Sequence, residues 1–423
     1  MKKIFEKDYY IFSIYAIGLI NWFFKLNYLY LILILGLSFF IILKNYDRKH
    51  LISLILCTPF VHYNDYYNIV YLIAGLILIC LYTYDIYKND RLLINEIIVA
   101  MLILLVLMTF SLFYTLDFNL SFYGVLKFGI YAFVLVYLNS VKTDKIMTIV
   151  NSVMYLGVLV ILEIGLFFLE NYQTNFLDNI KVLDLGWGGY DLISLTFIIS
   201  FIVTTIGYLK TYKYKYFLFI LGFISLSILT LTKGSYISIL IISVPYALLL
   251  YNKNEKNTYL VKQFVFYVII ALAFRLLVSN PTGITDYWFE RIERDNFLDD
   301  KYLLIKKGLE VIKINPIFGL GANVSSLFIS NYEYIFDSKY FPNFVIQTIA
   351  TIGILGIIAL LYFIFVVIKS LISKNIYNTF VLLMFIVILI QGLFDASFYT
   401  GIVMIILSII LSGIERKETA VAE

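Results

Sequence analysis

The stretch IKINPIFGLGANVSSLF, residues 312–328, lies in the only long polar interval of an otherwise apolar sequence. Pro316 disfavours the continuation of a helix, and Gly319 and Gly321 permit a tight turn because they carry no side chain. Lysines precede the stretch, and an apolar run begins at residue 342. The sequence therefore predicts a tight turn in a polar interval that divides two apolar parts of the chain.

The composition around this interval is that of a membrane protein. Of the 423 residues, 62% are hydrophobic and 14% are charged, and the mean hydropathy is +0.91. Soluble globular proteins carry about 25% charged residues. The charged and then apolar start, residues 1–24, looks like a signal peptide, but no small-residue cleavage site follows, which predicts a retained first span. The net charge of +4 does not indicate a nucleic-acid partner.

The apolar runs predict an all-α polytopic fold with twelve to fourteen transmembrane helices, because a span needs about 20 apolar residues. The lower number applies if two short spans form a re-entrant pair. Cys57 and Cys80 lie in apolar runs and are expected to pack as small hydrophobic residues. The predicted spans are 9–24, 28–43, 51–62 (the least secure), 67–84, 93–114, 122–140, 146–169, 190–209, 216–231, 234–251, 259–278, 342–368, 377–392 and 397–413.

The distribution of basic residues predicts that both termini are cytoplasmic. With that orientation the short outer loops hold only Lys25, Lys181 and Lys233, whereas most other lysines and arginines fall in cytoplasmic segments. The predicted organisation has four parts. These are an N-terminal transmembrane bundle (1–278), a long extracytoplasmic loop that we expect to act as an active-site lid (279–341), C-terminal spans (342–413) and a cytoplasmic tail (414–423).

The long loop contains a predicted amphipathic helix over residues 299–314 that lies on the membrane surface. Two aspartates, Asp299 and Asp300, favour its start because acidic side chains stabilise a helix N-terminus. Pro316 ends it. The residues available for its apolar face are Tyr302, Leu303, Ile305, Leu309, Ile312 and Ile314.

The turn and the run after it carry a family pattern. The segment Asn315–Gly321, followed by PNFVIQTIATIGILGIIALL, resembles the O-antigen polymerase and O-antigen ligase superfamily over about residues 215–370. The residues that match the family helix are Asn343, Gly353, Ile354, Leu355 and Gly356, and a weaker match lies at Thr232, Lys233 and Gly234.

Two residues depart from the family pattern. Pro342 stands where many members have a His proposed as general base, and the chain's two histidines, His50 and His62, lie elsewhere. Lys233 replaces an Arg, which keeps the charge but loses the bidentate geometry for phosphate.

The resemblance implies an enzyme that joins oligosaccharide repeat units carried on a polyprenyl diphosphate, of the undecaprenyl type, at the outer face of the bacterial cytoplasmic membrane. Cations at the interface would stabilise the diphosphate leaving group, so neither a metal nor another cofactor is expected. The product would be a capsular or O-antigen polysaccharide. The alternatives are a ligase that transfers finished glycan, and a flippase; the missing His favours a polymerase, and the lack of an internal repeat disfavours a flippase. A chain-length regulator and a flippase are possible partners.

The candidate site residues fall into three groups. Arg291 and Arg294 are three residues apart and would share a helix face that clamps a diphosphate, although they can instead pair with neighbouring acids. Lys306 and Lys307 can instead extend to lipid head groups. Lys127 and Glu163 are intramembrane and can pair with each other. The predicted catalytic residues are Arg291, Lys233 and Arg275, the substrate-binding residues are Arg294, Lys306, Lys307, Asn343, Gly319 and Gly321, and the candidate bases are Glu290, Asp286, Glu333 and Asp337.

Overall fold

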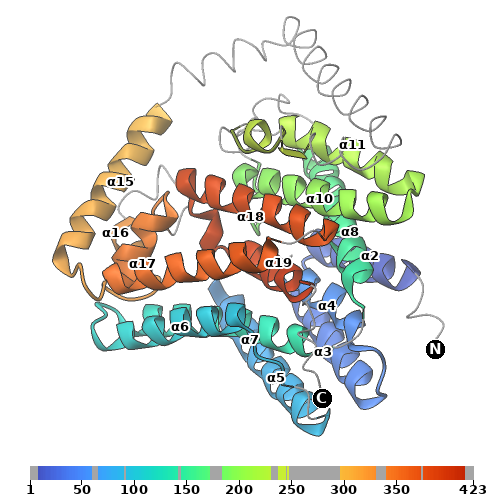
Figure 1. The fold of residues 1–423 in the computed structure, drawn as a ribbon, viewed down its shortest axis with the longest axis horizontal. Coiled ribbons are helices and arrows are strands. Elements are labelled where there is room, and N and C mark those ends of the chain that lie inside the picture. The colour runs from blue at the N-terminus through green and yellow to red at the C-terminus, as the bar shows by residue number, and fades with distance from the viewer. Residues whose placement is uncertain are drawn as a thin grey trace, which may run out of the picture.

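The structure, a computed structural model, describes residues 8–59, 65–89, 92–141, 144–171, 183–229, 237–243, 245–246, 296–329, 340–372 and 375–414. Within these ranges the chain is a set of helices joined by short turns, as Figure 1 shows, and a single β-bridge joins Asp184 and Gly189. The predicted all-α class is confirmed. The main helices are α2 (Asp8–Phe24), α3 (Asn27–Leu43), α4 (Leu51–Cys57), α5 (Asp65–Asn89), α6 (Glu96–Phe110), α7 (Phe118–Ser140), α8 (Ile146–Glu170), α10 (Tyr190–Thr211), α11 (Tyr214–Leu229), α15 (Asn296–Ile314), α16 (Ser325–Ile329), α17 (Phe344–Leu371), α18 (Ile376–Phe394) and α19 (Gly401–Ser412).

The helix lengths agree with a polytopic membrane protein. In the part of the chain that the structure describes, six helices are long and apolar enough to cross a bilayer, namely α6 with its short 3-10 extension to Phe113, α7, α8, α10, α17 and α18. Shorter apolar helices are α2, α3, α11 and α19. The predicted span 259–278 lies outside the described residues, and so does about half of the predicted span 234–251.

One predicted span, 51–62, is wrong. The helix there is α4, which ends at Cys57 after seven residues, and at about 1.5 Å per residue it is far too short to cross a membrane. All seven residues are buried, because α4 packs between α2, α8 and α19. A run that is apolar on every side fits a short helix inside the protein as well as a span, and only the packing distinguishes the two.

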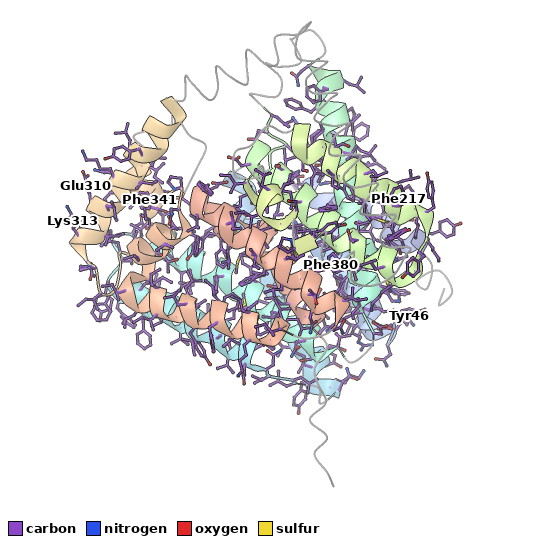
Figure 2. All side chains as sticks on the ribbon, turned by 45° about the horizontal axis from the view of Figure 1, so that its top comes forward. Tyr46, Phe217, Glu310, Lys313, Phe341 and Phe380 are labelled. Carbon is purple, nitrogen blue, oxygen red and sulfur yellow. The ribbon has the colours of Figure 1, made fainter. Side chains whose placement is uncertain are left out.

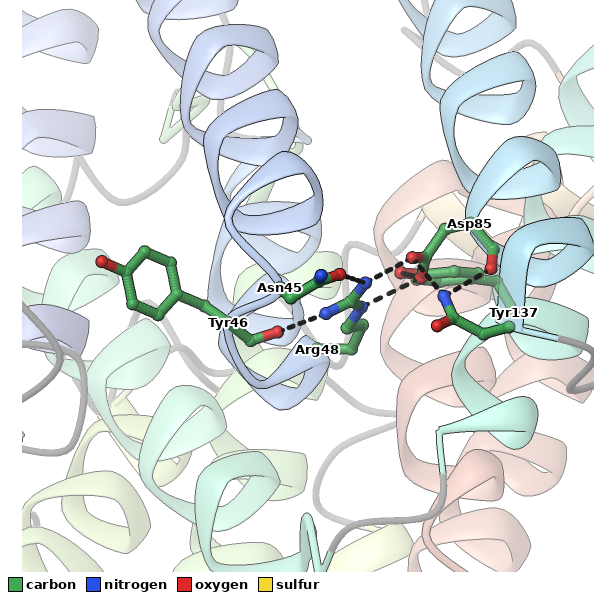
Figure 3. Close-up of polar contacts among 6 residues, drawn as sticks. Asn45, Tyr46, Arg48, Asp85 and Tyr137 are labelled. Atoms are coloured by element: carbon green, nitrogen blue, oxygen red, sulfur yellow. Dashed lines mark hydrogen bonds and ion pairs between the residues drawn. The ribbon is translucent and has the colours of Figure 1, made fainter.

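A buried ion pair ties together the ends of three helices at one side of the bundle. The Arg48 guanidinium, which follows α3, donates to both carboxylate oxygens of Asp85 in α5, at 3.1 and 2.5 Å. Tyr137 of α7 donates its hydroxyl to the same carboxylate at 3.0 Å. Figure 3 shows that Asn45 and the backbone carbonyl of Tyr46 accept from the same guanidinium. The charge of Arg48 is therefore hydrogen-bonded on several sides, as a buried charge must be.

The predicted amphipathic helix is present as α15, and it runs across the end of α17 rather than alongside it (Figure 1). Of the six residues proposed for its membrane-facing apolar side, Tyr302, Leu303, Leu309 and Ile314 are exposed. The face that packs on the protein is a different one and includes the buried Leu304 and Val311. In Figure 2, Glu310 and Lys313 point away from the body of the protein, and Phe341 lies on the inner side of α15. The hydrophobic cluster under α15 consists of Leu304, Val311, Leu320, Val324, Ile329, Phe341 and Ala350.

Candidate functional site

Helix α17 is interrupted at Gly353, and the interruption is the centre of the candidate site. The backbone of Gly353 has φ 72° and ψ −166°, a conformation that is essentially restricted to glycine. A break in a helix removes backbone hydrogen bonds between successive turns. The N–H and C=O groups that lose these bonds need other hydrogen-bond partners when they are shielded from water.

The turn 315–321 supplies those partners. Leu320 donates its N–H to the Ala350 carbonyl at 2.9 Å, and Gly321 donates to the Thr351 carbonyl at 3.0 Å. In the opposite direction, the N–H of Ile354 donates to the Pro316 carbonyl at 2.9 Å. The two motifs that the sequence separates by about thirty positions therefore bind each other through their backbones.

The glycines in both segments are required by this close approach. A Cβ on Gly319, which has φ +73°, would lie 2.5 Å from the backbone nitrogen of Ile352, and a Cβ on Gly353 would lie 2.6 Å from that of Phe318. Each distance is below any normal carbon contact. A side chain at either position would separate the turn from the helix.

A third segment, the connection between α6 and α7, holds the other side of the turn. Leu116 donates its N–H to the Leu320 carbonyl at 3.3 Å. The ring of Phe318 stacks on that of Tyr114, with centroids 4.7 Å apart and planes at 14°. A Cβ on Gly321 would lie 2.7 Å from the Cβ of Thr115. This contribution of residues 114–121 was not predicted, because in the sequence they read only as the end of one span and the start of the next.

The start of α17 is fixed by side-chain hydrogen bonds. The Asn343 side chain caps the helix, accepting from the N–H groups of Val345 and Ile346 at 2.9 and 3.2 Å, and its amide donates to the Leu393 carbonyl at 3.0 Å. Gln347, one turn later, is buried and donates to the hydroxyl of Ser325 at 3.0 Å. The first turns of α17 are thus connected to both α16 and the end of α18.

Comparison with known proteins assigns the segment that contains these contacts. Residues 217–361 match the family model described as O-antigen ligase. This segment is therefore similar to the O-antigen ligase family. The match includes the turn 315–321, which we call the inserted turn, and the break in α17. It therefore confirms the resemblance drawn from their motifs. No curated protein matches the chain.

Further polar side chains lie near the start of α17 and around the end of α18. The hydroxyls of Thr348 and Tyr399 are hydrogen-bonded to each other, and the Tyr340 ring lies 6.4 Å from that of Tyr399. Burial raises the pKa of Tyr399, so its hydroxyl remains protonated and can act as a donor. Gln391 donates to the Asp191 carbonyl at 3.0 Å, and its buried Oε1 has no hydrogen-bond partner among the described residues. The bond between Thr348 and Tyr399 connects the start of α17 to the segment after α18.

Several predicted substrate-binding residues have structural partners here. Asn343 is the cap just described, and the N–H groups of Gly319 and Gly321 already donate to backbone carbonyls, those of Asn315 and Thr351. A substrate contact through these two amides would have to replace those bonds. Pro342, in the position of the family His, is buried next to the cap. The substrate-binding assignment of Asn343, Gly319 and Gly321 stays a prediction.

The two lysines of α15 that were predicted to bind substrate, Lys306 and Lys307, differ in their surroundings. Lys306 is exposed. Lys307 forms an ion pair with Glu310, with Nζ and Oε2 3.4 Å apart. The remaining proposed site residues, namely Arg291, Lys233, Arg275, Arg294, Glu290, Asp286, Glu333 and Asp337, lie outside the described residues. Within the described ranges, no group of three His, Cys, Asp or Glu side chains is placed to hold a metal ion.

The expected pair between Lys127 and Glu163 is wrong. One carboxylate oxygen of Glu163 accepts from the indole Nε1 of Trp187 at 2.8 Å, and the other has no hydrogen-bond partner in the described part of the chain. The Cε of Lys127 instead lies 3.6 Å from the position that a Cβ on Gly401 would take. Trp187 belongs to the connection before α10. It is 24 residues from Glu163 in the sequence, and no sequence pattern indicates this contact.

Proposed function

We propose that this protein is a membrane-embedded glycosyltransferase that polymerises oligosaccharide repeat units carried on undecaprenyl diphosphate. The observation that carries the proposal is the superfamily match over residues 217–361, which includes the inserted turn and the broken helix. The loop side of the protein would lie outside the bacterial cytoplasmic membrane and both termini inside, as the basic residues predict. The product would be a capsular or O-antigen polysaccharide.

The reaction transfers a glycosyl group from a diphosphate oxygen to a hydroxyl oxygen. The bond between the anomeric carbon of the donor glycan and its diphosphate breaks, and the electron pair leaves with the diphosphate. A hydroxyl of the acceptor repeat unit forms the new bond to that carbon, and its proton passes to a base. The developing negative charge on the diphosphate is the feature that the protein has to stabilise.

Arg291, Lys233 and Arg275 are proposed to contact the diphosphate oxygens and neutralise this charge, which removes the need for a metal ion or another cofactor. Arg294, Lys306 and Lys307 would extend the cationic surface, with Lys307 released from Glu310. The candidates for the base are Glu290, Asp286, Glu333 and Asp337. A chain-length regulator and a flippase for the lipid-linked unit are proposed as functional partners.

Transfer to a lipid or cell-wall acceptor, as a ligase performs, is the second candidate. The observation that favours polymerisation is Pro342, which places a side chain without a proton acceptor where the family His stands in many ligases. The acceptor thus distinguishes the two candidates: a ligase joins the glycan to a different class of molecule, whereas a polymerase joins it to another repeat unit.

The test is made with the purified full chain in lipid nanodiscs, supplied with polyprenyl-diphosphate oligosaccharide, and the products are resolved on a gel. A ladder of lengthening glycans is expected, and it should be lost in Arg291→Ala, Lys233→Ala and Arg275→Ala variants that remain folded. Lys369→Ala is the matched control, because that exposed lysine pairs with Glu96 at the opposite end of α17 from the cap. Glycan transferred only to an added acceptor lipid would establish the ligase, and movement of the lipid-linked unit across a vesicle bilayer without transfer would establish a flippase.

A further inference from the structure

An exposed surface of mixed apolar and basic character surrounds the inserted turn. It consists of one face of α15, the tip of the turn and the connection between α6 and α7, and we refer to it as the α15 face. Its large apolar members are well exposed. They are Tyr302 (64% exposed), Leu309 (49%), Phe113 (79%), Tyr114 (47%) and Phe318 (40%).

The neighbouring helices fix the level of this surface relative to a bilayer. The helical segments Glu96–Phe113 and Phe118–Ser140 are both candidate spans, so residues 114–117 between them lie at a membrane surface. Phe318 stacks on Tyr114, which brings the inserted turn to the same level. The part of α17 beyond the break, 354–371, rises about 27 Å at about 1.5 Å per residue, close to the thickness of the hydrocarbon core.

The earlier part of α17 then stands above the hydrocarbon region, and α15 packs against it. The contacts involve Gly308, where an added Cβ would lie 2.5 Å from the side chain of Ile346 in α17, and the buried Leu304 and Val311, which share a hydrophobic cluster with Ala350. Figure 1 shows α15 crossing the end of α17. A helix at this level and in this orientation lies within the head-group layer.

The outward side chains of α15 fit that layer. Tyr302, Lys306, Leu309 and Lys313 follow one another at the spacing of a single helix face, and all four are exposed. Exposure of this face to bulk water would leave the apolar surface of Tyr302 and Leu309 hydrated. A contact with another protein that excludes water would bury the charges of Lys306 and Lys313. The interface of a bilayer accepts both kinds of side chain, because aromatic and aliphatic groups reach the acyl chains while the lysines reach the phosphates.

We propose that the α15 face binds anionic phospholipids of the surrounding bilayer. Lys306 and Lys313 contact the head-group phosphates, and Tyr302, Leu309, Phe113 and Phe318 contact the boundary of the acyl chains. Lys307 forms an exposed ion pair with Glu310 and is not among these contacts. The inference rests on exposure, level and charge, and it holds whether or not the chain transfers glycans.

The first test counts bound lipid by native mass spectrometry. The full chain, purified free of lipid-linked oligosaccharide, is titrated with phosphatidylglycerol and, separately, with phosphatidylcholine. Lys306→Ala and Lys313→Ala are each expected to weaken phosphatidylglycerol binding about fivefold, and phosphatidylcholine binding should not change. The matched control is Lys313→Arg, which keeps the positive charge at the same position of the helix and should leave both lipids bound as before.

The absence of oligosaccharide carrier in this test separates the two sources of phosphate. Unchanged phosphatidylglycerol binding in the Lys306→Ala/Lys313→Ala double variant would overturn the proposal. If that same variant had a raised KM for the polyprenyl-diphosphate donor in the nanodisc assay, the lysines would belong to the substrate site instead.

A depth measurement tests the apolar half of the proposal. A nitroxide is attached at Leu309→Cys in a Cys80→Ser background, since Cys57 is buried, and the chain is placed in vesicles that contain phosphatidylglycerol. Collisions with oxygen should exceed those with a water-soluble nickel complex. The reverse ratio would mean that the face is turned to water, and dipolar coupling between labels would mean that a second copy covers it; either result overturns the proposal.

Discussion

Gly353 of α17 and Ile317 of the inserted turn are in direct backbone contact, so that a Cβ on the glycine would overlap the Ile317 carbonyl. Gly353→Ala is expected to lower the melting temperature of the purified protein substantially, because it adds this overlap to a conformation that already costs about 1–3 kcal/mol for a non-glycine residue. The measurement is thermal unfolding in detergent.

Gly165→Ala provides the control for this substitution. Gly165 lies in α8, and a Cβ there would meet nothing within 4 Å, so its replacement should leave the melting temperature unchanged or raise it slightly. Equal effects at the two glycines would contradict the role given to the break in α17.

Removal of one partner from the buried Arg48–Asp85 pair is expected to destabilise the fold by about 3–5 kcal/mol, because the other charge is left uncompensated. Arg48→Met and Asp85→Leu should each show this loss in chemical unfolding, while the double variant should recover part of it. The exposed pair between Lys369 and Glu96 is the comparison, and its removal should cost less than about 1 kcal/mol. Additive losses at Arg48 and Asp85 would contradict the coupling.

Glu163 is expected to hold the connection before α10 through the Trp187 indole. Glu163→Ala removes the buried acceptor, so the amides of residues 183–189 should exchange hydrogen faster, measured by mass spectrometry. Glu163→Gln keeps a carbonyl oxygen in place and should preserve the slow exchange. Equal exchange in both variants would show that the indole contact does not hold this segment.

Asn343 can act as a helix cap, as a substrate ligand, or as both, and two substitutions separate these roles. Asn343→Ala should cost about 1 kcal/mol of stability because the first N–H groups of α17 lose their acceptor. Asn343→Ser restores a capping oxygen and should restore stability. If the serine variant also makes the full glycan ladder, the residue acts only as a cap; a stable variant with a raised KM for the donor would support the predicted substrate contact.

Local patterns in the sequence were sufficient for the fold class and for the two glycine segments of the candidate site. The apolar runs predicted most of the helices, and the two glycine motifs led to the superfamily that the match over 217–361 supports. The end of α15 at Ile314 was predicted, whereas its start lies at Asn296, before the predicted Asp299. These features depend on the composition and spacing of residues within one helix or turn, so they can be recognised without knowing what that segment packs against.

The tertiary structure alone decided which of these elements meet. It showed that the glycine turn fills the break in α17, that the α6–α7 connection holds the turn from the other side, and that Leu304 and Val311 form the packed face of α15. It also gave Glu163 the partner Trp187 in place of Lys127. Such pairings form because buried backbone and charged groups need hydrogen-bond partners. Those partners come from segments that are distant in the sequence.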